Sequence, residues 1–102
     1  MSEQGKAVHE YELVYIIQPE ISEDDLAGLN LRVTNLIAAQ SGTVTGSELW
    51  GKRALAYPIQ NKFEGHYVLQ RFQMDPAGTG ELERLLRFSE DVLRYLVIRT
   101  DE

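Results

Sequence analysis

Apolar residues recur along the chain in stretches that predict alternating strands and helices. Residues 11–18 follow a strand pattern with apolar side chains on both faces, as in a central strand, and Pro19 ends this strand. Ser22 is a typical N-cap for the helix that follows, and Gly42 is the residue expected to end that helix. Five apolar residues at helical spacing mark its buried face: Leu26, Leu29, Val33, Leu36 and Ile37.

The rest of the chain predicts three further strands and one short helix. Residues 43–57 are extended, with Gly46 and Gly51 expected to form bulges or bends. A polar turn is predicted at residues 60–65 and another strand at residues 67–74. The remaining elements are a loop at residues 76–80, a helix at residues 81–88 and a last strand at residues 92–99.

This β-α-β-β-α-β order predicts a ferredoxin-like α+β sandwich, in which a four-stranded antiparallel sheet carries two helices on one face. The first and third strands are central in that topology, and the second and fourth are edges that offer unpaired backbone groups to a partner. A single domain is expected over residues 9–100, between a flexible segment at residues 1–8 and a tail at residues 101–102.

The face of the sheet that lacks helices is predicted to be apolar, with Arg71, Arg94 and Trp50 near its rim. Such a patch marks a docking surface, unless a loop or tail of the same chain covers it. The side chains assigned to the helix side are Leu13, Tyr15, Ile17, Val68, Phe72 and Met74. Those assigned to the open face are Val14, Ile16, Tyr67, Leu69, Leu96 and Ile98.

The chain is acidic overall, with a net charge of −6, but its middle segment is basic. Residues 27–74 carry two acidic and five basic side chains, whereas residues 1–26 carry seven acidic and one basic. The net field repels nucleic acid, so a contact with nucleic acid is expected only through the middle segment. The absence of cysteine excludes disulfides, thiol catalysis and zinc sites that need a thiolate.

No arrangement of residues predicts an enzyme, a metal site or a cofactor. His9 and His66 are far apart in the sequence and are not in a metal-ligand spacing. No serine lies in a nucleophile elbow, and the fragment Gly78–Gly80 precedes a short acidic helix that disfavours phosphate. Aromatic side chains on a sheet also suggest RNA stacking, but residues 67–72 lack the basic, glycine-rich pattern of the RNA-recognition motif.

The most distinctive segment is residues 50–59, Trp-Gly-Lys-Arg-Ala-Leu-Ala-Tyr-Pro-Ile, which places two cations between a glycine and an apolar strand. From its glycine onward this segment resembles the S-six family of bacterial small-ribosomal-subunit proteins. The resemblance covers residues 9–100 and extends to Tyr11-Glu12-Leu13 with Pro19, to Gly65 with a strand ending at Met74, and to Asp91-Val92-Leu93-Arg94.

The resemblance implies a ferredoxin-like fold and a structural, non-enzymatic role in translation, in the small ribosomal subunit. It implies binding to the central domain of 16S ribosomal RNA together with the small basic S-eighteen ribosomal protein, as a heterodimer. The chain is then expected to be monomeric when free, cytoplasmic and ribosome-associated. The alternative that the pattern leaves open is a ferredoxin-like homodimer that encloses a small ligand, as an enzyme or a regulatory module.

Nine residues are the candidates for these contacts. Lys52 and Arg53 are expected to contact RNA phosphates, with help from Arg94 and Arg99 at the far edge of the sheet. For Arg53, the alternative is an ion pair with an acidic side chain on the neighbouring strand. The residues expected to dock the protein partner are Trp50, Tyr67, Leu69, Leu96 and Ile98.

Overall fold

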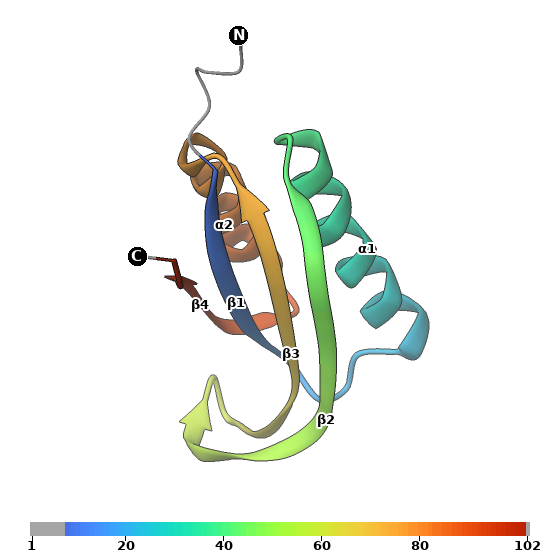
Figure 1. Ribbon diagram of the computed structural model, residues 1–102. Helices are drawn as coiled ribbons and strands as arrows, with labels where there is room; N and C mark the ends of the chain where they lie inside the picture. The colour runs from blue at the N-terminus through green and yellow to red at the C-terminus, as the bar shows by residue number, and fades with distance from the viewer. Residues whose placement is uncertain (1–7, 102) are drawn as a thin grey trace, which may run out of the picture.

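A computed structural model describes residues 8–101, and within this range the chain forms four strands, two α-helices and a short 3₁₀ helix (Figure 1). The end segments predicted at residues 1–8 and 101–102 lie outside this range except for Val8 and Asp101. In chain order the elements are β1 (His9–Ile17), α1 (Glu23–Ala39), β2 (Thr43–Ile59), β3 (Lys62–Met74), the 3₁₀ helix η2 (Pro76–Gly78), α2 (Thr79–Phe88) and β4 (Val92–Arg99).

The strands form one antiparallel sheet in the order β2-β3-β1-β4, and both helices cover the same face of it (Figure 1). This arrangement confirms the predicted ferredoxin-like sandwich with β1 and β3 in its centre. All six residues assigned to the helix side lie in the hydrophobic core. The helices contribute Leu29, Val33, Ile37, Leu82 and Leu86 to the same core.

The helix α1 begins as predicted, but its end uses a different residue. Ser22 Oγ accepts a hydrogen bond of 3.1 Å from the Asp25 N–H, which is the expected N-cap interaction. At the other end Ser41, rather than Gly42, takes the left-handed conformation, with a φ of 64°. Gly42 is required for close packing instead, because a Cβ there would lie 2.7 Å from the carbonyl oxygen of Gln73.

The turn between β2 and β3 is much shorter than the predicted turn at residues 60–65. Only Gln60 and Asn61 separate the two strands, so β3 starts at Lys62. Both turn residues have a positive φ, 51° and 64°, as a two-residue type I′ hairpin turn requires. Glycine usually signals this turn, and its absence here explains why the sequence pattern misplaced the start of β3.

The loop predicted at residues 76–80 is also wrong, because this segment is helical. Asp75 Oδ1 accepts a hydrogen bond of 2.9 Å from the Ala77 N–H and caps η2. Pro76 fits the first turn of a helix, where its missing N–H would have no partner. The helix α2 follows directly and includes Gly80, so it starts at Thr79 rather than at the predicted residue 81.

Three irregularities bend β2. The first two are those predicted, since the register against β3 shifts just before Gly46 and just before Gly51, and Gly51 has a left-handed φ of 84°. The third lies between Ala54 and Ile59, where residues 55–58 of β2 face a single residue of β3. We call residues 55–61 the hairpin arm, and Figure 1 shows it curving beneath the sheet toward β4.

The phenol of Tyr15, in the core of β1, predicts a loss of stability at alkaline pH. Tyr15 Oη donates a hydrogen bond to Asn30 Oδ1 of α1, and burial raises the pKa of Tyr15 to about 12. This tyrosine ionises near pH 10 in the unfolded chain, so stability is lost as pH rises from about 10 to about 12, by up to about 3 kcal/mol. Urea titrations should show that Tyr15→Phe lacks this component, and an equal alkaline loss in both proteins would contradict the assignment.

Two glycine substitutions should change stability in opposite directions. A Cβ at Gly65 would lie 2.5 Å from Ile16 Cγ2 and 3.1 Å from the Ile17 carbonyl oxygen, so Gly65→Ala should cost about 1–3 kcal/mol. Gly28 lies inside α1, and a Cβ added there would meet nothing within 4 Å, so Gly28→Ala should stabilise the protein by about 0.5–1 kcal/mol. Denaturant midpoints measure both changes in stability. Stabilisation by Gly65→Ala would contradict the close packing of Gly65 against β1.

Candidate functional site on the open sheet face

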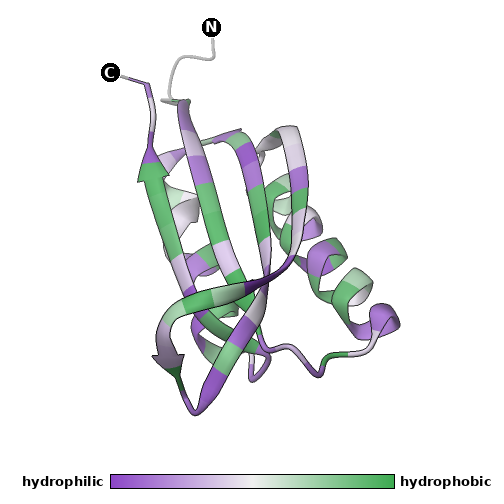
Figure 2. Ribbon diagram, turned by 90° about the horizontal axis from the view of Figure 1, so that it is seen from below, coloured by the Kyte–Doolittle hydropathy of each residue, from purple (hydrophilic) through white to green (hydrophobic). Residues whose placement is uncertain are grey.

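The face of the sheet opposite the helices is partly apolar and partly accessible. Leu96 and Ile98 on β4 are 56% and 44% exposed, and Trp50 on β2 is 37% exposed. Figure 2 shows apolar stretches of β4 and β1 next to one another on this sheet. Tyr67 is half-buried, but Leu69 is only 4% exposed, so a charged residue in its place would disturb the sheet itself.

The hairpin arm covers one end of this face. A cavity of about 110 Å³ lies between the arm and the sheet, with Leu55 and Tyr57 on one side and Ile16 and Tyr67 on the other. Ile16 is buried as a result. The alternative that a loop of the same chain covers the patch therefore holds for the Ile16 end, whereas the β4 side remains exposed.

A chain of polar contacts crosses the open face from β1 to β2. Arg71 donates hydrogen bonds of 3.1 Å to Glu12 Oε2 and to Glu48 Oε2, and Trp50 Nε1 donates one of 2.8 Å to Glu48 Oε1. The hydrogen bonds from Trp50 and from Arg71 hold the pKa of Glu48 below its usual value. Trp50 is thus fixed on this face, and the charge of Arg71 is compensated by Glu12 and Glu48.

Two arginines on this face stack on aromatic rings. The Arg53 guanidinium lies 5.2 Å from the centre of the Trp50 ring, and Trp50 in turn stacks on Tyr67 with 6.3 Å between ring centres. The Arg94 guanidinium lies 5.6 Å from the Tyr57 ring and donates a hydrogen bond of 2.7 Å to its hydroxyl. Within the described part of the chain, the expected alternative for Arg53, an ion pair with an acidic neighbour, does not form.

Strand alternation divides the two cations of the distinctive segment. Lys52 pairs in register with His66 and Arg53 with Gly65, so their side chains leave opposite faces of the same edge strand. Lys52 lies close enough to Glu20, in the loop after β1, for its charge to affect that carboxylate. A hydrogen bond from Lys62 is the main cause of the lowered pKa of Glu20, and the charge of Lys52 adds to it.

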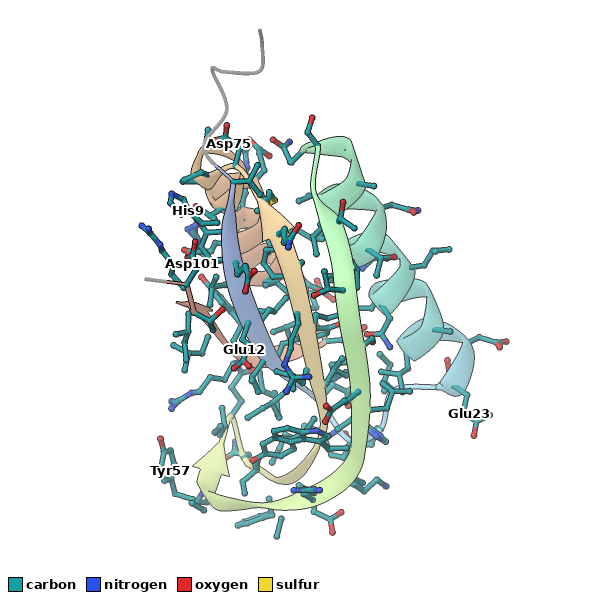
Figure 3. All side chains as sticks on the ribbon, in the orientation of Figure 1. His9, Glu12, Glu23, Tyr57, Asp75 and Asp101 are labelled. Carbon is teal, nitrogen blue, oxygen red and sulfur yellow. The ribbon has the colours of Figure 1, made fainter. Side chains whose placement is uncertain are left out.

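Arg99 lies apart from the other candidates. It pairs in register with Tyr11, a core residue, and its Nε donates a hydrogen bond of 3.0 Å to Asp101 Oδ1. Asp101 also lies 3.1 Å from His9 Nδ1, and Figure 3 shows these two residues together at the far end of the sheet from Tyr57. The structure therefore brings Arg53 and Arg94 to the open face, but not Lys52 or Arg99.

Sequence reasoning did not assign roles to Glu48 and Tyr57. Glu48 positions Trp50 and Arg71, and Tyr57 supports Arg94. Both roles depend on which residues face each other across strands, and that register follows from bulges whose size no local pattern gives. For Tyr57, its place in the distinctive segment was the one available signal.

Residues 8–101 contain no group of three His, Cys, Asp or Glu side chains that could hold a metal ion. No helix in this range is long and apolar enough to cross a membrane.

Comparisons with known proteins agree with one another. The family described as Ribosomal protein S6 matches residues 10–99. The chain is 49% identical over 92 residues to the small ribosomal subunit protein bS6 of Caldanaerobacter subterraneus subsp. tengcongensis, covering 90% of this chain and 97% of that protein. It is 44% identical over 95 residues to the bS6 protein of Geobacter metallireducens, covering 93% and 80% of the two chains.

A solved structure supports the same assignment. The crystal structure of 30S ribosomal protein S6 from Thermotoga maritima superimposes with a TM-score of 0.88 at 29% identity, covering 92% of this chain and 89% of that one. The resemblance read from residues 50–59 is thereby confirmed, and the homodimeric enzyme is not favoured. The chain belongs to the ribosomal protein S6 family, whose members are structural proteins of the small ribosomal subunit and not enzymes.

Proposed function

We propose that this small-subunit protein binds the central domain of 16S ribosomal RNA together with the small basic S-eighteen ribosomal protein. The observation that carries the proposal is that a chain with a net charge of −6 has both an exposed apolar patch on β4 and exposed cations on β2. In this proposal the free chain is monomeric, and it functions as part of the ribosome in the cytoplasm.

The outer edge of β2 is the proposed contact with RNA. Lys52 and Arg53 leave opposite faces of this edge strand, so a phosphate backbone running along the edge meets both side chains. The stack on Trp50 holds Arg53 in place and leaves guanidinium N–H groups available to phosphate oxygens. Arg94 lies beside the hairpin arm and adds a third contact, whereas Arg99 contributes less because Asp101 neutralises it.

The remaining apolar surface of the open face is the proposed contact with the protein partner. Leu96 and Ile98 form its exposed part on β4. Across β1, Tyr67 and the buried Leu69 lie on β3, and Trp50 lies on the edge strand β2. A basic partner is favoured because this chain is acidic, and charge complementarity speeds association and selects the partner. The partner also supplies phosphate neutralisation that the chain's own net charge does not provide.

Replacing both cations at the β2 edge should weaken RNA binding and reduce its salt dependence. With Lys52→Ala and Arg53→Ala combined, the slope of log affinity against log salt should fall by about 1.5–2, since two phosphate contacts are lost. Anisotropy titrations with a central-domain RNA fragment and the S-eighteen protein measure this slope. The matched control removes Arg32 and Arg84 from the helical face and should leave the slope unchanged. An unchanged slope in the β2 variant would rule out this edge as the contact.

A carboxylate on β4 should disrupt binding of the protein partner. Leu96→Glu places an unpaired charge in the proposed interface, so affinity for the S-eighteen protein should fall by at least about tenfold. Leu49→Glu is the control, because Leu49 is 64% exposed and pairs in register with the core residue Val68, away from the open face. Calorimetric titration of both folded variants provides the measurement. Equal affinities for the two variants would exclude the β4 patch.

A further inference from the structure

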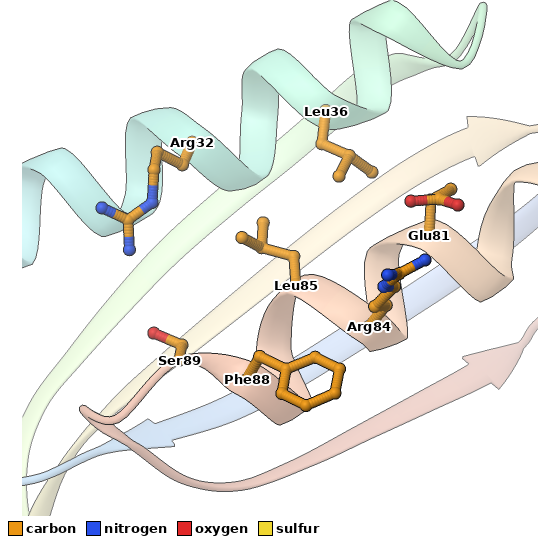
Figure 4. A pocket seen from close by; sticks show the side chains of 7 residues that line it. All are labelled: Arg32, Leu36, Glu81, Arg84, Leu85, Phe88 and Ser89. Atoms are coloured by element: carbon orange, nitrogen blue, oxygen red, sulfur yellow. The ribbon is translucent and has the colours of Figure 1, made fainter.

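A second surface lies on the helical side of the protein, between α1 and α2. The outer surfaces of the two helices leave a groove of about 450 Å³ (Figure 4). Its floor is apolar, since Leu36 of α1 and Leu85 of α2 point into it and both are only partly buried. The groove lies between the helices, whereas the proposed partner contact lies on the opposite face of the sheet and the proposed RNA contact follows the β2 edge, so the groove is separate from both.

The end of α2 contributes an aromatic ring that the fold does not bury. Leu82 and Leu86 lie one helical turn apart on the core face of α2 and are fully buried. Phe88 follows two residues later, away from that face, and is 74% exposed beside the groove. The ring and the apolar floor together offer a surface that a bulky apolar side chain of another molecule would cover.

The charge of the groove is opposite to that of the whole chain. Arg32 of α1 and Arg84 of α2 line it, and Glu81 is the one acidic side chain among its lining residues. Within residues 8–101, neither arginine forms an ion pair with an acidic side chain. The groove therefore joins an apolar floor to two exposed cations whose charges are not neutralised by the fold.

We propose that this groove docks a short acidic segment of another protein, with a bulky apolar side chain on the floor and carboxylates on Arg32 and Arg84. Charge complementarity favours this occupant, because the groove is locally basic in a chain of net charge −6. A nucleic-acid strand is less well matched, since phosphate binding draws on longer rows of cations than the two arginines of the groove.

The test uses the full chain, labelled with nitrogen-15, and a synthetic peptide with aspartates on both sides of a central Phe-Leu pair. Amide shifts should concentrate on Leu36, Leu85 and Phe88, and binding should weaken as salt is raised. Arg32→Glu combined with Arg84→Glu should weaken binding by at least about tenfold, and Phe88→Ala should weaken it several-fold. All three positions are exposed, so the fold should be retained.

The controls separate this proposal from the proposed ribosomal contacts. Lys52→Glu combined with Arg53→Glu makes the same charge change on β2 and should leave peptide binding unchanged, whereas it should weaken RNA binding. Equal loss in both double variants would reduce the effect to net charge and overturn the proposal. So would stronger groove shifts with a single-stranded RNA oligonucleotide, or groove shifts that depend on protein concentration without peptide, which would indicate a second copy of the chain.

Discussion

Two helices cannot cover both faces of a four-stranded sheet, and this constraint shapes the whole molecule. The central strands carry apolar side chains on both sides, so the face without helices needs another cover. The hairpin arm supplies part of it by folding over Ile16, and Leu96 and Ile98 stay accessible. The part of the sheet that the chain leaves uncovered is the surface available to a partner, so fold and assembly share one cause.

The electrostatics of the open face follow from how its charges are held. Arg71 is satisfied by Glu12 and Glu48, whereas Arg53 and Arg94 stack on aromatic rings. A stacked guanidinium keeps its charge and most of its hydrogen-bonding capacity, and its position is restrained before binding. The chain can therefore be acidic overall and still present ordered cations, because stacking does not neutralise them as carboxylates would.

The sequence predicted the element order, the side of the sheet that each central residue faces, and the two glycine bulges, since all three depend on local periodicity and backbone freedom. It misplaced the turn at Gln60 and Asn61, which take positive φ without glycine, and the start of α2, which continues directly from the 3₁₀ helix η2 that Asp75 caps. It also treated Lys52 and Arg53 as one contact. Strand alternation alone separates them, but which of the two reaches the open face follows from cross-strand register, which no single stretch of sequence encodes.

Residues 55–58 of β2 separate the part of the hairpin that fixes strand alignment from the part that forms the turn. On one side of it the pairs up to Ala54 fix the sheet, and on the other Ile59 and Lys62 close the turn. Residues 55–58 have no one-to-one partners on β3, so inserting or deleting a residue there alters the reach of the arm without shifting the pairing of either flank. Contact distance and strand alignment are thus adjustable independently in this scaffold.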